Sequence, residues 1–248
     1  MINNIILIAS NELRRFFKSP LAWIILALVQ FLVAIFFYVP LITYLQPASV
    51  ASGLTDAVVS TMYGFAAYII LMISPLITMR LIAEERQLGT IKLLLSSPIS
   101  ITEIVLGKFF GITIFYILIL ILITLMPASL LFGTHLDLGQ VASAFIGLLL
   151  LMISIASIGL FLSSLTNSPA TAAVSTFGIL FFLLIIKIGG TNASLEIAEI
   201  SSYLSLVSHY NNFLSGLFNS IDVFYYILLT IFFIILCIWR LDTERIYG

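Results

Sequence analysis

Six long apolar runs constrain this 248-residue sequence more than any other feature. They cover residues 21–41, 58–79, 109–132, 141–163, 170–188 and 221–239. About 20 apolar residues in a helix cross the hydrocarbon core of a bilayer, so each run is long enough for one membrane-spanning helix. The period-2 alternation that marks the strands of a membrane β-barrel is absent from the sequence. The runs therefore predict an all-α membrane protein with six transmembrane helices.

The composition excludes an ordinary soluble domain. Only 8% of the residues are charged and 62% are hydrophobic, whereas a soluble domain carries roughly a quarter charged residues. Surfaces this apolar match lipid and would aggregate in water. No polar stretch between the runs is long enough to form a separate domain. We therefore expect residues 1–248 to form one transmembrane domain in contact with membrane lipid.

The basic residues orient the six runs. If each run crosses the membrane once, nine of the ten basic residues fall in segments on the same side of the membrane. These nine are Arg14, Arg15, Lys18, Arg80, Arg86, Lys92, Lys108, Arg240 and Arg245. Only Lys187 belongs to the opposite side. Because short loops rich in Lys and Arg stay in the cytoplasm, both termini and residues 80–108 are predicted to be cytoplasmic, and residues 189–220 to lie outside.

Residues 1–19 show the pattern of an amphipathic helix. At 100° per residue, the polar and basic side chains fall opposite one apolar stripe. The stripe contains Ile2, Ile5, Ile6, Ala9, Leu13, Phe16 and Phe17. Such a helix lies in the headgroup layer of the membrane, and Ser19-Pro20 would turn the chain into the first run. A frayed terminal segment is the alternative.

The apolar runs lack the residues that ion-driven carriers use. Proton- and sodium-coupled transporters place ionisable side chains inside the membrane, but no charged residue lies in the middle of a run. Gln30 is the notable polar residue deep in the first run, and a buried Gln is more often a contact between helices than a substrate ligand. If the protein moves something uphill, the energy must come from elsewhere.

The sequence carries no signal for chemistry of its own. A phosphate-binding GxxxxGK[ST] loop is missing, because Phe109 follows Gly107-Lys108. His135, His209 and Cys237 stand alone, without the spacing of metal ligands. We therefore expect no catalytic residue, no cofactor site and no metal site in this chain, and we do not expect it to be an enzyme.

The segment between the second and third runs, residues 80–108, is predicted to form an elbow that projects from the membrane. The second helix is expected to continue through Arg80 and residues 84–86 and to break at Gly89. A short apolar helix over residues 90–95 would then end at Pro98. The bases of the elbow are charged and its tip is apolar.

A helix start follows directly. Ser100 and Glu103 have the spacing of a capping box, which predicts a helix that runs from there into the third run. Apolar residues exposed between charged ones more often mark a docking surface than a plain connection. An ordinary connecting loop, with basic residues that only orient the protein, is the alternative.

The elbow resembles the coupling elbow of ABC-2 type permeases, the membrane subunits of ABC exporters. The resemblance lies in the runs Glu84-Glu85-Arg86, Leu88-Gly89-Thr90, Leu93-Leu94-Leu95, Ser97-Pro98-Ile99-Ser100 and Leu106-Gly107-Lys108. Two further segments resemble the gliding-motility-associated branch of these permeases. They are IGLFLSSLTNSPATAA at residues 158–173 and YLSLVSHYNNFLSGLFNSIDVFYY at residues 203–226.

The resemblance implies six helices, an N-terminal amphipathic helix and a separate ABC ATPase subunit that binds ATP and Mg. It also implies a set of ATPase-coupling residues in the elbow. These are Glu84, Glu85, Arg86, Gly89, Thr90, Leu94, Ser97 and Pro98. The acidic pair Glu84-Glu85 would then face basic groups of the ATPase; the alternative is that it faces water beside Arg80 and Arg86.

The outer segment, residues 189–220, is expected to form two short helices that dip into the outer leaflet. His209, Tyr210 and Phe213 are candidates for an outer gate that touches a departing substrate, and a structural outer lid is the alternative. One six-helix subunit is too small to enclose a large path. A second permease copy or a related permease subunit is therefore an expected partner.

These observations predict the membrane-spanning permease subunit of an ATP-binding cassette exporter in the bacterial cytoplasmic (inner) membrane. A separate ATPase would supply the energy. The alternative is a non-transporting mechanical transmitter or membrane anchor, driven by the same ATPase and acting on an outer accessory protein. No nucleic acid is expected as a partner.

Overall fold

Six long helices form the body of the protein in a computed structural model that describes residues 2–46, 53–91, 93, 96, 99–190 and 203–247. The described part is helical and contains no strand. The six are α2 (Pro20–Tyr44), α3 (Thr61–Thr78), α6 (Ile101–Leu130), α7 (Leu138–Leu165), α8 (Pro169–Gly190) and α11 (Ser220–Tyr247). A π-helical segment, η1 (Thr55–Ser60), leads into α3. Each predicted run coincides with one helix long and apolar enough to cross a membrane, so the predicted fold class is confirmed.

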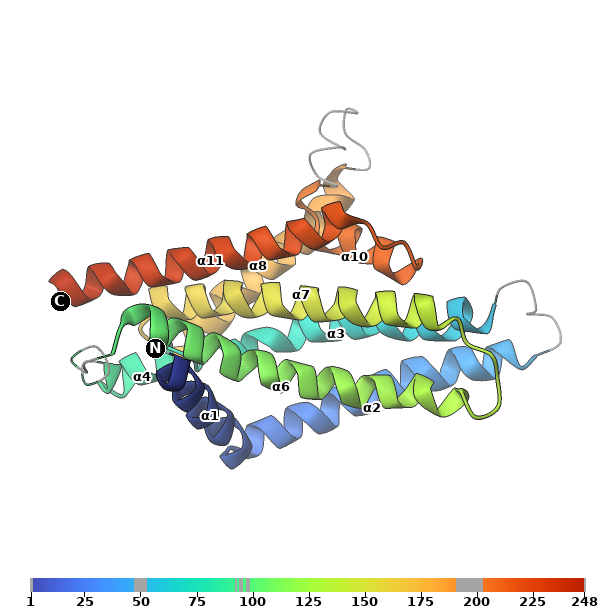
Figure 1. The fold of residues 1–248 in the computed structure, drawn as a ribbon, viewed down its shortest axis with the longest axis horizontal. Helices are drawn as coiled ribbons and strands as arrows, with labels where there is room; N and C mark the ends of the chain where they lie inside the picture. Colours follow the sequence, from blue (N-terminus) through green and yellow to red (C-terminus); the bar gives the residue numbers. More distant parts are fainter. Residues whose placement is uncertain are drawn as a thin grey trace.

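The long helices lie lengthwise beside one another (Figure 1). Three shorter helices complete the described chain: α1 (Ile2–Lys18), α4 (Ala83–Gln87) and α10 (Leu206–Leu214). Both termini, α1, α4, the start of α6 and the end of α11 lie at one end, which we call the basic end (Figure 1). The turn over residues 131–137, α10 and the start of α11 lie toward the other end, the far end.

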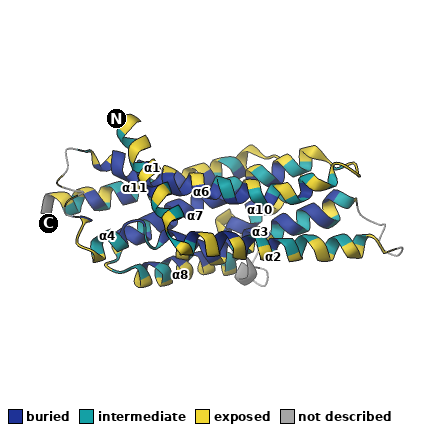
Figure 2. Ribbon diagram, turned by 90° about the horizontal axis from the view of Figure 1, so that it is seen from below, coloured by how far each residue is buried: buried dark blue, intermediate teal, exposed yellow. Residues whose placement is uncertain are grey.

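Helix α7 is the centre of the bundle. It packs against α3, α6, α8, α10 and α11, and 67% of its most apolar window is buried, against 17% in α8. The outer helices α2, α8 and α11 keep large apolar side chains exposed (Figure 2). Exposed apolar side chains on a membrane-spanning helix contact lipid, so burial separates one central helix from a lipid-facing layer.

One glycine sets how closely α7 approaches α3. A Cβ atom at Gly159 would overlap the side chain of Thr78. Thr78 is fully buried and its hydroxyl donates to the carbonyl oxygen of Ser74 at 3.0 Å, so it has no room to move aside. The missing side chain at Gly159 therefore allows the two helices to touch.

The predicted continuation of the second helix into the elbow was wrong. Helix α3 ends at Thr78, residues 79–82 form a turn, and α4 begins at Ala83. The cause lies on α7, where Ser163 Oγ accepts the backbone N–H groups of Ile82 at 3.1 Å and Ala83 at 2.9 Å. The same hydroxyl donates to the carbonyl oxygen of Met79 at 3.2 Å. A side chain from another helix thus binds the backbone groups that the break between α3 and α4 leaves without a hydrogen-bond partner.

The predicted start of α6 is confirmed. Ser100 Oγ accepts the backbone N–H of Glu103 at 3.2 Å, and Glu103 Oε2 accepts the backbone N–H of Ser100 at 3.0 Å, which completes the capping box. Of the short helix predicted over residues 90–95, only Thr90, Ile91 and Leu93 lie within the described part. In the outer segment α10 is one short helix, and residues 191–202 lie outside the described residues.

Replacing Gly159 by Ala should lower the thermal stability of the protein, because the added methyl group overlaps a fixed neighbour. Overpacking of this kind costs about 1–3 kcal/mol. Gly178→Ala on α8 is the matched control, since a Cβ there meets no atom within 4 Å. The unfolding midpoint in detergent should fall for the first variant only; equal midpoints for the two would contradict the close packing of α7 on α3.

Candidate ATPase-coupling site at the basic end

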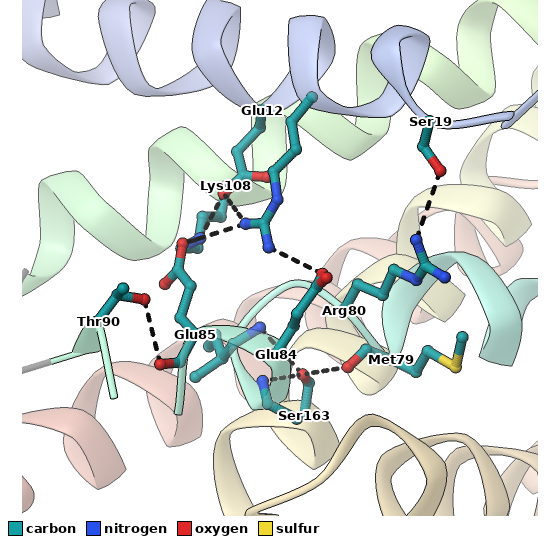
Figure 3. Close-up of polar contacts among 12 residues, drawn as sticks. Glu12, Ser19, Met79, Arg80, Glu84, Glu85, Thr90, Lys108 and Ser163 are labelled. Carbon is teal, nitrogen blue, oxygen red and sulfur yellow. Dashed lines mark hydrogen bonds and ion pairs between the residues drawn. The ribbon is translucent and has the colours of Figure 1, made fainter. Parts of the chain in front are cut away.

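A buried ammonium group joins three helices at the basic end. Lys108 of α6 is 1% exposed, and its Nζ donates to Glu85 Oε1 of α4 at 2.6 Å and to Glu12 Oε1 of α1. Figure 3 shows Lys108 between these two carboxylates. A charge removed from water is tolerated only when it is paired and hydrogen-bonded. The position of Lys108 therefore depends on both glutamates.

Arg15 of α1 extends the pairing toward the surface. Its Nη2 lies 2.8 Å from Glu84 Oε2, and its Nη1 lies 3.4 Å from Glu85 Oε1. The Arg15 side chain is 39% exposed, so solvent screens its pairs more than those of Lys108. Five residues, Glu12, Arg15, Glu84, Glu85 and Lys108, form what we call the ion cluster. It combines three carboxylates with two cations.

A close contact of α1 with α6 places Glu12 within reach of Lys108. Helix α1 packs along the start of α6. A Cβ atom at Gly111 of α6 would lie 2.8 Å from Glu12 Cβ, which is closer than real Cβ atoms approach. The glycine therefore allows α1 to lie directly on α6. The predicted amphipathic helix is present, and its inner face rests on another helix while Ile2 and Ile6 stay exposed.

Helix α4 is also tied to the other side of the bundle. Arg86 Nη1 donates to the carbonyl oxygen of Thr166, just beyond α7, at 3.0 Å, and Arg86 Nη2 pairs with Glu244 of α11. Ser163 of α7 binds the first backbone groups of α4. A helix of only five residues thus has polar contacts with α1, α6 and α11 and with the last turn and C-cap residue of α7.

The structure places Glu84, Glu85 and Arg86 together on α4, as the sequence predicts. The alternative, in which the acidic pair only faces water beside Arg80 and Arg86, does not describe its contacts, and a contact of the pair with basic groups of an ATPase stays a prediction. Both carboxylates pair within the chain, with Arg15 and Lys108. Their contribution to the elbow is therefore to hold α4 against α1 and α6.

The tip of the elbow follows α4. Gly89 has φ +73°, a left-handed conformation that favours glycine, and it ends the helix. Thr90 is exposed, and its hydroxyl donates to the carbonyl oxygen of Glu85 at 3.2 Å. Leu88 and Leu93 are 67% and 74% exposed, so the described part of the tip presents apolar side chains. Three predicted coupling residues lie outside the described residues: Leu94, Ser97 and Pro98.

Three members of the ion cluster were not predicted as site residues. In the sequence, Lys108 was interpreted as a charge that orients the protein in the membrane, and Arg15 as a charge that faces the lipid headgroups. Glu12 is the informative case, because it lies three residues after Ala9 and seven after Ile5, at the edge of the apolar stripe of α1. A lone carboxylate at the edge of an apolar face indicates a buried cationic partner.

The candidate outer-gate residues lie on α10 and are all buried. His209 Nδ1 lies 2.6 Å from Asp222 Oδ1, and its Nε2 lies 3.0 Å from the carbonyl oxygen of Tyr203. The Tyr210 hydroxyl donates to the carbonyl oxygen of Tyr63 at 3.0 Å. Burial, followed by the neighbouring Tyr63 and Tyr226, raises the pKa of Tyr210 well above its ordinary value, so this hydroxyl remains a donor.

Phe213 is fully buried and packs where Gly147 of α7 leaves space. These contacts fasten α10 to the bundle, as the structural-lid alternative expects. A role in gating a substrate stays a prediction. Within the described residues, no group of three or more His, Cys, Asp or Glu side chains is arranged to hold a metal ion.

A model of the ABC-2 family transporter proteins matches residues 6–245, nearly the whole chain. The chain belongs to the ABC-2 transporter family. Members of this family are membrane subunits without their own nucleotide-binding site, and they generally work with an ABC ATPase subunit. A search of curated proteins found no match. The family resemblance of the sequence is confirmed, and the gliding-motility-associated branch stays a prediction.

Replacing Lys108 by Met in this ABC-2 permease should destabilise it strongly, because Glu12 and Glu85 would lose their buried partner. Breaking a buried ion pair from one side costs about 3–5 kcal/mol. The triple variant Lys108→Met, Glu12→Gln, Glu85→Gln should recover most of the loss. Arg14→Met, an exposed change on α1, is the control and should alter stability by less than about 0.5 kcal/mol.

Thermal unfolding in detergent measures all three variants. A triple variant no more stable than Lys108→Met alone would contradict the charge pairing as the cause.

Proposed function

We propose that this ABC-2 permease is the membrane subunit of an ATP-binding cassette exporter, moved by a separate ATPase that docks on the basic end. One observation carries the proposal: the short helix α4, next to the exposed tip of the elbow, has polar contacts with four other helices. A force applied at the tip is therefore passed to α1, α6, α7 and α11 together.

The energetics of these contacts support transmission rather than local bending. Lys108 and Glu12 are almost fully buried, and separating a buried pair costs several kcal/mol, far more than separating an exposed one. When ATP, with Mg, drives the ATPase to close, α4 would move as a unit with the start of α6 and with α1. Reorientation of the long helices would follow.

The packed interior supports a path between subunits. Leu148, Leu151 and Ile155 along α7 are fully buried, so side chains fill the centre of this bundle. A substrate would then pass at the contact with a second permease copy or a related permease subunit. The segments over residues 158–173 and 203–226 support the gliding-motility-associated branch as the closest group.

The alternative, a mechanical transmitter or membrane anchor that acts on an outer accessory protein, shares the same α4 contacts, and the filled interior favours it as well. The two functions differ in whether ATP hydrolysis moves a substrate across a sealed membrane. In both, the protein lies in the bacterial cytoplasmic membrane with its termini, and therefore its basic end, in the cytoplasm.

Cysteine labelling tests this orientation with two exposed threonines, in a variant that lacks the buried Cys237. Thr134→Cys, in the turn at the far end, should react with a membrane-impermeant maleimide in intact cells. Thr90→Cys, at the tip of the elbow, should react only after permeabilisation. Labelling of Thr90→Cys in intact cells would contradict the proposed orientation.

Leu93→Asp should weaken ATPase binding at least tenfold, equivalent to about 1.4 kcal/mol, because it places a charge in an apolar contact. Leu93 is 74% exposed, so insertion and folding should be unaffected. Phe132→Asp is the matched control, an exposed apolar residue at the far end that is 96% exposed. Co-purification of the ATPase and permease-stimulated ATP turnover are the measurements, with membrane abundance checked for each variant.

Normal abundance with lost ATPase association for Leu93→Asp alone is the expected result. Full association of the ATPase with Leu93→Asp would mean that the tip is only a connecting loop.

A further inference from the structure

A groove of about 510 Å³ opens at the basic end between α1, the start of α2 and the turn after α3. We call it the basic groove. Its polar wall contains Arg14, Arg15, Lys18 and Arg80. Its apolar wall contains Phe16, Leu21, Ala22 and Leu81. A cavity of this size can hold a small ligand with one charged group and one apolar part.

Within the described residues, the charges of the basic groove are not balanced. Its two carboxylates are already paired, Glu12 with Lys108 and Glu84 with Arg15. In the part of the chain that the structure describes, Arg14 and Lys18 have no carboxylate partner, and Arg80 contacts only the hydroxyl of Ser19, at 3.4 Å (Figure 3). Three cations therefore face the groove with their charge available to an anion.

The groove lies at the level of the membrane surface. Trp23, one turn into α2, is 58% exposed, and its indole N–H donates to the carbonyl oxygen of Phe17 at 3.0 Å. Exposed tryptophans gather at the boundary between lipid tails and headgroups. The unpaired cations of α1 are therefore placed where the phosphates of the lipid headgroups lie.

A second groove, purely apolar and about 310 Å³ in volume, lies between α2 and α3, further along α2. Leu28 and Leu32 of α2 line it, and they share one helix face with Leu21 of the basic groove, at spacings of seven and eleven residues from Leu21. The rise from Leu21 to Leu28 is about 10 Å. On α3, Met72 lines the same groove and precedes Arg80 by eight residues. An extended apolar chain fits this course.

We propose that the two grooves form a binding site for one anionic glycerophospholipid. Its phosphate would contact Arg14, Lys18 and Arg80, and an acyl chain would lie between α2 and α3. Basic pockets at the cytoplasmic side of membrane helices recognise anionic headgroups in this way. The site is independent of the ATPase coupling proposed above and requires only that the basic groove open at the membrane surface.

Tyr68→Trp places a reporter in the apolar groove, because Tyr68 lines this groove and is 43% exposed. The two tryptophans of the chain, Trp23 and Trp239, are 58% and 69% exposed and lie outside the groove, so Trp23→Phe and Trp239→Phe leave the Tyr68→Trp side chain as the single reporter. The protein is reconstituted in phosphatidylcholine bilayers that contain increasing fractions of brominated phosphatidylglycerol or of brominated phosphatidylcholine. Bromine quenches a neighbouring tryptophan. Quenching should reach half its maximum at a several-fold lower fraction of brominated phosphatidylglycerol than of brominated phosphatidylcholine.

The double variant Arg14→Gln, Lys18→Gln should lose this preference by about fivefold per charge removed. Both side chains are exposed, so the fold should be retained. Arg240→Gln, Arg245→Gln is the matched control, because it removes the same charge from the same end of the bundle but outside the groove. It should keep the full preference. An equal loss in the two double variants would indicate general surface charge and overturn the site.

Two further measurements separate other occupants. Calorimetric titration of glycerol 3-phosphate into protein in phosphatidylcholine bilayers should show no saturable binding. Saturable binding there, without a preference among brominated lipids, would assign the groove to a soluble phosphate compound. Loss of ATPase co-purification in Arg14→Gln, Lys18→Gln with unchanged lipid preference would assign it to the ATPase. Either result would overturn the lipid proposal.

Discussion

The arrangement of the basic end depends on the neutralisation of one buried ammonium group. Lys108 is out of water, and its charge is matched only when Glu12 from α1 and Glu85 from α4 are both in place. Because a buried unpaired charge is costly, this requirement fixes three helices relative to one another. Helix α1 and the elbow are therefore parts of one unit.

Much of the fold follows from local sequence signals. Each apolar run specifies its own helix, because about 20 apolar residues have no stable alternative in lipid. The capping box of Ser100 and Glu103 is equally local, and both were predicted correctly. The last helix extends to Tyr247, beyond the predicted end at residue 239, because charged residues such as Asp242 and Glu244 continue a helix outside the hydrocarbon.

The site was predictable only in part, because its geometry comes from residues far apart in the sequence. The elbow residues Glu84, Glu85 and Arg86 were identified by resemblance, but their partners Arg15, Lys108 and Glu244 belong to other helices. The break between α3 and α4 has no capping signal in its own segment, since Ser163 supplies the cap from α7. Single-sequence patterns carry no record of such distant contacts.

The cap supplied by Ser163 has a consequence for the order of assembly. Helix α4 is too short to be stable alone, and the hydroxyl that caps it is made 80 residues later in the chain. Glu244, the partner of Arg86, follows 158 residues after it. During synthesis the elbow therefore gains its final shape only after α7, and then α11, have been inserted. An ATPase that docks there, as proposed above, would bind completed subunits in preference to nascent ones.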